Sequence, residues 1–246
     1  MKKVYSINLK MSKCKLQKFY NDKTNLLEIG IDEVGRGPMF GRVYSAAVIL
    51  PKNDDFKFEL LKDSKKFTSE KKITEAATYI KESALAWSIA YEDERVIDSI
   101  NIINATHNSM HKAITAIINK KTTNDVRLCE KYYLLVDGNG FKPYTYLNNN
   151  SNMIEQIDNV LVEGGDNKYC SIAAASILAK VERDKYIREM CEKYEKLIEY
   201  YDLKKNKGYG TKNHLNGIQT YGISPWHRKT YGCCKTAQIN PEEFYI

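Results

Sequence analysis

The chain has 246 residues, 43% of them hydrophobic, and a formal net charge of +7 at pH 7. This length suits one α/β domain with a sizeable core and a small appendage, and the positive charge favours a polyanionic partner. No apolar run is long enough to cross a bilayer, and the six cysteines include no Cys-x-x-Cys pair, so we exclude membrane-spanning and disulfide-stapled secreted proteins. We therefore expect an intracellular, cytoplasmic protein in a reducing compartment.

Asp32 and Glu33 follow the first predicted strand, the apolar run 26–31, and precede the turn Gly35-Arg36-Gly37-Pro38. Adjacent residues on an extended strand point to opposite faces. The two acids can therefore converge only if the backbone turns sharply, as the glycines allow. They are either turn residues at a strand exit or part of a metal site, and other acids must decide between the two.

The pattern of apolar residues predicts a mixed α/β sheet. The first three strands are expected at 26–31, 43–50 and 84–91. Helices are expected after Ser69, from near Glu94 and from near Ser171. Residues 142–152, which contain a run of three asparagines, are interpreted as a flexible surface loop.

Two further acids follow apolar strand segments. Asp137 comes after residues 133–136, and Asp166 comes after residues 160–165 and just before a helical pattern. Oxygen ligands of this kind suit Mg²⁺ or Mn²⁺. Asp184 is a rival acid, but it lies several turns along the helix and is interpreted as an exposed or arginine-paired surface residue.

These acids lie in motifs that follow one another along the chain. The first motif is Gly30-Ile31-Asp32-Glu33-Val34-Gly35-Arg36-Gly37-Pro38, followed by residues 43–50. The others are Asp63-Ser64-Lys65-Lys66, Asn101-Ile102, Asp137-Gly138, Gly165-Asp166, residues 171–184, Gly208-Tyr209-Gly210-Thr211 with His214, and His227-Arg228. In kind and in order these motifs resemble those of ribonuclease HII. The resemblance covers about Glu28 to Tyr231, and chance does not readily produce so many motifs in one order.

The resemblance implies a ribonuclease H-like fold with a small C-terminal helical segment. It implies that two divalent ions, Mg²⁺ or Mn²⁺, are held by four catalytic acids: Asp32, Glu33, Asp137 and Asp166. We expect like charges gathered in this way to raise the carboxyl pKa values, and we expect Mg²⁺ to stabilise the fold.

The resemblance also implies a set of substrate contacts. The loop of Gly35, Arg36 and Gly37 resembles a sensor of the ribose 2′-hydroxyl, and Tyr209 resembles a tyrosine that packs on the next sugar. Positions near the substrate backbone are matched by Ser64, Lys65 and Asn101. His214 and His227 match no zinc or triad pattern, so we expect them to order the C-terminal segment.

We divide the chain into a basic N-terminal extension (1–27), a catalytic domain with the helical segment (28–231) and a C-terminal tail (232–246). Lysines of the extension and those around Tyr209 are interpreted either as phosphate contacts or as a solvated surface. The tail from Gln238 to Tyr245 loosely resembles a sliding-clamp peptide, although Pro241 replaces its aliphatic residue, and a disordered tail is the alternative.

The predicted function is a metal-dependent endoribonuclease of the ribonuclease H type 2 class, acting as a monomer. It is expected to cleave the RNA strand of RNA–DNA hybrids and to nick 5′ of single ribonucleotides in duplex DNA, leaving 3′-hydroxyl and 5′-phosphate ends. One alternative is a hybrid nuclease without junction preference, as in ribonuclease HIII; however, that enzyme carries an added N-terminal domain for which the first 27 residues are too few. The other is a non-catalytic hybrid-binding protein.

Overall fold

The computed structural model describes residues 16–21, 26–124, 131–148, 151–240 and 244. Its centre is a five-stranded mixed sheet with the order β3-β2-β1-β4-β7. The strands are β1 (Leu26–Val34), β2 (Val43–Ile49), β3 (Ala86–Glu92), β4 (Lys131–Asp137) and β7 (Asn159–Val162). β2 is antiparallel to β1 and β3, whereas β4 runs parallel to β1 and to β7. The predicted mixed α/β sheet is thus confirmed.

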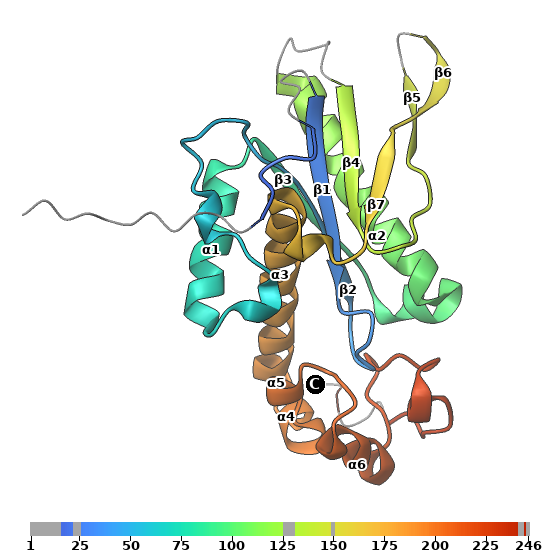
Figure 1. Ribbon diagram of the computed structural model, residues 1–246. Coiled ribbons are helices and arrows are strands. Elements are labelled where there is room, and N and C mark those ends of the chain that lie inside the picture. The colour runs from blue at the N-terminus through green and yellow to red at the C-terminus, as the bar shows by residue number, and fades with distance from the viewer. Residues whose placement is uncertain (1–15, 22–25, 125–130, 149–150, 241–243, 245–246) are drawn as a thin grey trace, which may run out of the picture.

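Helices cover both faces of this sheet (Figure 1). On one face lie α1 (Glu70–Ser83) and α3 (Cys170–Lys193), and on the other lies α2 (Glu94–Asn124). The buried residues form a large apolar cluster on the α1–α3 side and a second one on the α2 side. The sequence explains α1 directly, because the Ser69 side chain caps its first turn and four apolar residues at helical spacing are buried: Ile73, Ala76, Ala77 and Ile80.

The first turn of α3 lies directly on β1. A Cβ atom built on Gly30 would be 2.2 Å from the backbone carbon of Ser171, so only glycine permits this contact. The alanines that follow, Ala173, Ala174 and Ala175, are fully buried and keep the helix close to the sheet. Just outside this contact, the amide of Gln17 donates to the carbonyl of Lys168, and the amide of Cys170 donates to the carbonyl of Gln17. The segment from residue 16 to 21 is thereby joined to the start of α3.

Two expectations about the backbone were wrong. β1 does not end before the acids, because Asp32 pairs with Ala46 and Glu33 pairs with Ser45 in the ladder to β2. The sharp turn comes later, at Gly35, where φ is +99°. The predicted loop 142–152 contains part of an antiparallel hairpin, β5 (Thr145–Asn148) with β6 (Met153–Gln156). Glu155 stabilises this hairpin by accepting hydrogen bonds from Tyr146, Asn148 and Ser151.

A C-terminal helical segment follows α3 and lies at the end of the molecule away from the hairpin (Figure 1). Its helices are α4 (Lys196–Tyr201), α5 (Leu203–Asn206) and α6 (Lys212–Tyr221), followed by the 3-10 turn η4 (Gly232–Lys235). Within the predicted tail, Ile239 pairs with Ile223, and Phe244 is 4% exposed and packs against Trp226. A disordered tail is therefore wrong for these described residues, because the apolar ring of Phe244 is buried. No described helix is both long enough and apolar enough to cross a membrane.

Candidate metal and nucleic-acid site

The four predicted acids lie at the same end of three neighbouring strands. Asp32 is near the end of β1 and Asp137 is the last residue of β4; the register pairs Ile31 with Val136, so the two acids are neighbours across these parallel strands. Asp166 lies in the 3-10 turn η3 (Gly165–Asn167) between β7 and α3. Glu33 follows Asp32 on β1, and its side chain points to the opposite face of the strand because side chains alternate. Three acids therefore share the α3 face, and Glu33 starts from the other.

Burial and mutual repulsion raise the carboxyl pKa values at this end of the sheet. The pKa of Asp32 is raised well above its usual range, first by burial and then by the charges of Glu33 and Asp137. Burial is also the main cause of the raised pKa of Glu33, although the Arg36 guanidinium opposes it. The pKa of Asp166 is raised by burial and by the charges of Asp63 and Asp137. The expected rise is thus found at Asp32, Glu33 and Asp166, with burial as its largest cause and the charge of neighbouring carboxylates adding to it.

Each acid has its own local partner. Asp32 accepts hydrogen bonds from the amide of Glu33 and from the Ser176 hydroxyl, and Asp137 Oδ1 accepts one from the amide of Gly165 at 2.6 Å. Asp166 Oδ1 accepts one from the Asn167 side chain at 3.1 Å. Arg36 Nη1 lies 3.3 Å from Glu33 Oε1. In the described part of the chain, no three His, Cys, Asp or Glu side chains are close enough to hold a metal ion as they stand.

The donor set nevertheless fits a divalent cation. All four candidates are carboxylates, the oxygen ligands that Mg²⁺ and Mn²⁺ prefer. Asp137 interacts electrostatically with each of the other three. A cation placed among them would offset the repulsion between these carboxylates, so the charge of the site favours binding it.

Predicted phosphate contacts border Asp166. Lys65, in the 3-10 turn η2 (Ser64–Lys66), has its ammonium 3.9 Å from Asp166 Oδ2 and is 83% exposed in its side chain. Ser64 is buried, and its hydroxyl lies 3.0 Å from that of Ser176. Since Ser176 donates its one hydroxyl proton to Asp32, Ser64 must donate to Ser176. Ser64 therefore supports Asp32 through Ser176, whereas Lys65 is exposed beside Asp166.

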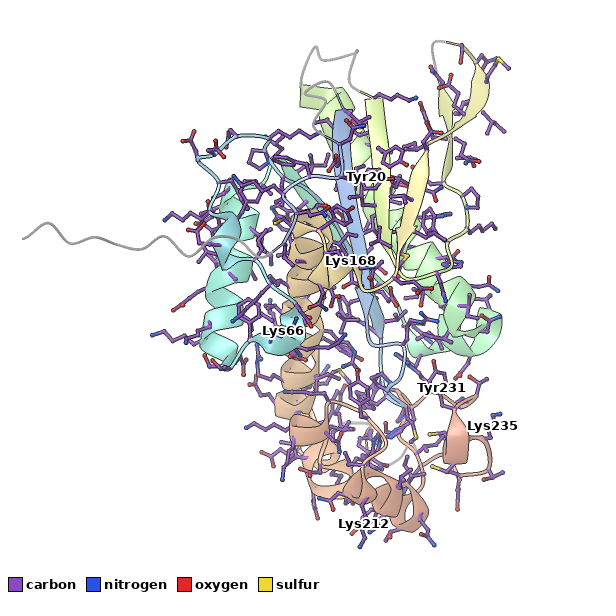
Figure 2. The ribbon with its side chains drawn as sticks, viewed as in Figure 1. Tyr20, Lys66, Lys168, Lys212, Tyr231 and Lys235 are labelled. Atoms are coloured by element: carbon purple, nitrogen blue, oxygen red, sulfur yellow. The ribbon has the colours of Figure 1, made fainter. Side chains whose placement is uncertain are left out.

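Asp63 and Asn167 hold this turn in place. Asp63 Oδ1 accepts a hydrogen bond from the amide of Lys65, and its Oδ2 accepts one from Asn167. Burial alone would raise the pKa of Asp63, but these hydrogen bonds and the charges of Lys65 and Lys66 lower it. Lys66 also bonds to the Asn167 side chain. Figure 2 shows Lys66 near α3 and Lys212 on α6.

Two buried arginines hold the Gly35–Gly37 loop. Arg228 is 0% exposed and donates to the carbonyls of Gly35, Arg36 and Gly41. Arg183 is 1% exposed and donates to the carbonyls of Phe40, Arg42 and Lys207. Burial lowers the pKa of Arg228 to about 10 and lowers that of Arg183 as well. Neither arginine has a carboxylate within salt-bridge distance among the described residues. Backbone carbonyls are therefore the main hydrogen-bond partners of both, and the Tyr231 ring lies 5.1 Å from the Arg228 guanidinium.

Both arginines lie in motifs of the sequence, but no role was predicted for either. The sequence does not reveal that Arg183 and Arg228 are buried, because each has polar residues on both sides in the chain. The burial of these arginines depends on how many backbone carbonyls of the glycine-containing turn lack amide partners, and the sequence does not show that number.

Tyr209 lies against the same loop. A Cβ built on Gly37 would be 3.4 Å from Cε1 of Tyr209, and the amide of Met39 donates to the carbonyl of Gly208. The Tyr209 ring is 49% exposed. The structure thus brings the predicted sugar-packing residue next to the predicted 2′-hydroxyl sensor, with one face open to solvent.

Asn101 has a separate position. It interrupts α2 with φ +67° and ψ +166°, and its Oδ1 accepts hydrogen bonds from the amides of Ile103 and Asn104. It therefore caps the second part of the helix. Asp184 was predicted to be exposed or paired with arginine; its side chain is 20% exposed and pairs with Lys180 at 2.9 Å, so the ion pair is present but its partner is a lysine.

The comparisons with known proteins agree with the motifs. The family profile described as Ribonuclease HII matches residues 29–234. The Ribonuclease HII of Bacteroides thetaiotaomicron is 42% identical over 216 residues, which is 88% of this chain and 94% of that protein.

Solved structures are similar in fold. The ribonuclease HII in the PCNA:RNase HII complex of Archaeoglobus fulgidus superposes with a TM-score of 0.58 at 22% identity, covering 84% of this chain and 95% of that one. The Bst-RNase HIII solved in complex with Mn²⁺ superposes with a TM-score of 0.54 at 20% identity, covering 80% of this chain and 63% of that one. These likenesses confirm the predicted ribonuclease H-like fold.

Proposed function

Because the chain belongs to the ribonuclease HII family of endoribonucleases, we propose that it nicks duplex DNA on the 5′ side of single embedded ribonucleotides, besides cleaving the RNA strand of RNA–DNA hybrids. The products would carry 3′-hydroxyl and 5′-phosphate ends. Family membership confirms the predicted enzyme class, a ribonuclease H of type 2. The junction preference, the number of metal ions and the role of each residue are proposals.

One observation carries the proposal. Asp32, Asp137 and Asp166 lie at the ends of adjacent elements on one face of the sheet, and burial and repulsion raise the pKa of Asp32 and Asp166. A protein built for stability alone would avoid this unneutralised charge. Its presence supports a site made for a cationic cofactor.

Asp32, Glu33, Asp137 and Asp166 would hold two divalent ions, Mg²⁺ or Mn²⁺. When bound, such ions supply an activated water nucleophile and stabilise the departing 3′ oxygen of a phosphodiester. The protein does the rest. Glu33 has to exchange its Arg36 partner for an ion, which frees the Arg36 guanidinium, 52% exposed in its side chain, for a phosphate. Lys65, beside Asp166, is placed to bind a neighbouring phosphate as a point charge.

Selection of the ribonucleotide would come from the loop and Tyr209. Arg228 binds the carbonyls of Gly35 and Arg36, so these peptide groups are held rigidly. A 2′-hydroxyl both donates and accepts, and rigid peptide groups can distinguish it from deoxyribose. Tyr209 beside Gly37 would then pack on the adjoining sugar.

The test is cleavage of three labelled duplexes of one sequence: an RNA–DNA hybrid, a DNA duplex with one ribonucleotide, and plain DNA. Each is incubated with Mg²⁺, with Mn²⁺ or with a chelator. We expect metal-dependent cleavage of the first two only, with polymerase-extendable 3′ ends. Cleavage of the hybrid but not of the single-ribonucleotide duplex would support the alternative of a hybrid nuclease without junction preference. Binding of these duplexes without cleavage would support the alternative of a non-catalytic hybrid-binding protein.

Asp137→Asn separates chemistry from binding. We expect it to abolish cleavage while substrate affinity stays within a few fold, because the lysines and the loop remain. Asp184→Asn is the matched control, since Asp184 is paired with Lys180 on α3. Equal loss of activity in both variants would contradict the assignment of Asp137.

A sliding clamp is a further proposed partner, through Gln238 to Tyr245. A protein of similar fold was solved in complex with PCNA. In this chain Phe244 packs against Trp226, so clamp binding would require its release from this contact. A pull-down in which Gln238→Ala leaves clamp association unchanged would dispose of this proposal.

A further inference from the structure

Two histidines of the C-terminal segment are hydrogen-bonded to each other. His214 on α6 and His227, which follows Trp226, are both 0% exposed, and their Nε2 atoms are 2.9 Å apart. They lie outside the group of four acids. Because Nε2 of one ring faces Nε2 of the other, a hydrogen bond forms only if one Nε2 carries a proton and the other does not.

The surrounding donors fix where the protons are. The amide of Ser224 donates to Nδ1 of His227 at 3.0 Å, so that nitrogen carries no proton. His227 must then be protonated on Nε2 and donate to Nε2 of His214. His214 in turn must be protonated on Nδ1, which lies 3.0 Å from the carbonyl oxygen of Tyr209 and donates to it. This assignment satisfies every contact with two neutral rings.

The surroundings keep both rings neutral. Tyr201 packs on both rings, with centroid distances of 5.9 Å to His214 and 4.7 Å to His227. Burial lowers the pKa of His214 and lowers that of His227 well below its usual range.

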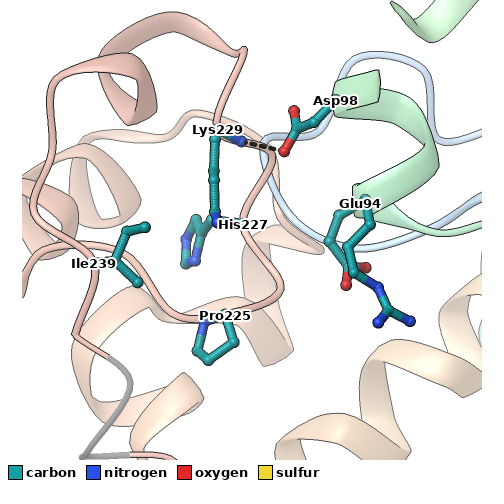
Figure 3. A pocket seen from close by; sticks show the side chains of 7 residues that line it. Glu94, Asp98, Pro225, His227, Lys229 and Ile239 are labelled. Carbon is teal, nitrogen blue, oxygen red and sulfur yellow. Dashed lines mark hydrogen bonds between the residues drawn. The ribbon is translucent and has the colours of Figure 1, made fainter. Parts of the chain in front are cut away.

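Charged groups lie on one side of His227. A cavity of about 360 Å³ is lined by His227 together with Glu94, Arg95, Asp98, Pro225, Lys229 and Ile239 (Figure 3). Asp98 accepts a hydrogen bond from the Lys229 amide, and the Arg228 guanidinium is bonded to carbonyls of the glycine loop. None of these charges replaces Ser224 as the partner of His227 Nδ1.

The end of this chain of hydrogen bonds is the residue proposed to bind the sugar. The Tyr209 carbonyl accepts from His214 and also from the amide of Thr211, the N-cap residue of α6. The aromatic ring of the same residue, Tyr209, lies next to Gly37. Holding the carbonyl therefore fixes the direction in which the ring leaves the backbone.

We propose that Ser224, His227 and His214 form a one-directional hydrogen-bond relay that positions Tyr209 against the glycine loop, and that this relay sets the preference for a single ribonucleotide over a continuous RNA strand. The inference rests on the proposed function, because Tyr209 would contact the sugar beside that ribonucleotide. The two histidines are positioning residues and do not touch the substrate. Each of the two accepting ring nitrogens already faces an N–H group, so a proton added to either one would bring two N–H groups face to face, and acid therefore breaks the relay.

The relay itself is tested without activity. The chain has four histidines, so their ¹⁵N imidazole signals can be assigned in the full-length protein by single substitutions. At pH 7 we expect a neutral Nδ1–H ring for His214 and a neutral Nε2–H ring for His227. A charged ring, or the opposite tautomer at either position, overturns the relay.

Its effect on selectivity is tested by kinetics with the hybrid and the single-ribonucleotide duplex. His214→Ala should lower kcat/KM for the single ribonucleotide about 10-fold and that for the hybrid less than about 3-fold. His214→Asn should recover most of this loss, because its amide can still donate to the Tyr209 carbonyl. His111→Asn, on α2, is the matched control, since His111 bonds to the carbonyl of Lys142.

Other outcomes are equally decisive. Equal loss on both substrates, or no recovery with asparagine, overturns the selectivity role. If His214→Ala does not fold, His227→Leu serves, because leucine fills the buried space but cannot donate to His214 Nε2, so the donor that sets the His214 tautomer is lost; it should show the same uneven loss. If the wild type cleaves neither substrate, the proposed function fails, whereas the tautomer measurement still decides whether the relay exists.

Discussion

Asp32→Asn should stabilise the metal-free protein while it abolishes cleavage. Asp32 is 4% exposed, and burial, Glu33 and Asp137 all oppose its charge. Each unit by which a pKa is raised costs the charged form about 1.4 kcal/mol, and hydrogen bonds from Glu33 and Ser176 offset part of this cost. We expect a gain of about 1–3 kcal/mol at pH 7, which corresponds to a rise in Tm of about 2–10 °C for a chain of this size.

The pH dependence follows from the direction of the shift. Because folding raises the pKa of Asp32, the folded wild type loses stability as pH rises from the unfolded value, near 4, through the folded value. The asparagine variant carries no such penalty. The advantage of the variant should therefore grow as the pH rises above about 4 and shrink toward pH 4.

Mg²⁺ should reverse the order of stability. A metal present at 100 times its Kd stabilises the folded wild type by about 2.7 kcal/mol, whereas the variant binds it more weakly. The assay is thermal unfolding of both proteins with chelator and with Mg²⁺. Asp184→Asn, which removes a carboxylate that is paired with Lys180, should change the stability by no more than about 0.5 kcal/mol under either condition. A metal-free Asp32→Asn protein that melts below the wild type would refute this reasoning.

Other predictions concern the scaffold. Gly30→Ala should destabilise the fold by about 3 kcal/mol or more in urea unfolding, since its Cβ would overlap the backbone of Ser171; a loss below about 1 kcal/mol would mean that α3 can move away. Arg228→Lys should cost about 2–3 kcal/mol by the same measurement, because one ammonium cannot reach the three carbonyls that the guanidinium binds, and an unchanged midpoint would show that water replaces it. Folding depresses the pKa of His214 and His227, so their contribution to the free energy of unfolding should be intact above about pH 6.5. Below that pH it should be lost by up to about 1.4 kcal/mol per pH unit for each ring. His227→Gln should reduce this dependence of the unfolding free energy on pH between pH 7 and 5, and an unchanged dependence would contradict the assignment.

The sequence predicted the strands and helices well where one periodicity dominates. The fully buried β2 and the amphipathic α1 are examples, because each presents an uninterrupted apolar pattern. The β5–β6 hairpin was missed because its strands are short and polar, and hydrogen bonds to Glu155 stabilise it. Such contacts between residues several positions apart leave no periodic signal.

The site was predictable as a set of residues but not as a geometry. Motifs indicated Asp32, Asp137 and Asp166, and the parallel strands bring them to one end of the sheet. Sequence did not reveal that Glu33 starts from the opposite face of β1, because the ladder to β2 continues past the point where a turn was expected. It also did not reveal that Arg228 is buried, since that depends on carbonyls contributed by a loop nearly 190 residues earlier in the chain.

The contact between Gln17 and the first turn of α3 bears on how the protein can be shortened. A trimmed version that starts at β1 would keep every strand of the sheet, yet the Lys168 carbonyl and the Cys170 amide would lose their backbone partners. Both groups lie within four residues of Asp166, so removing Gln17 would disturb the backbone next to this acid, although the two residues are far apart in sequence. Anyone who prepares a minimal version for crystallisation should therefore retain Gln17, and should attach purification tags where they do not pull on it.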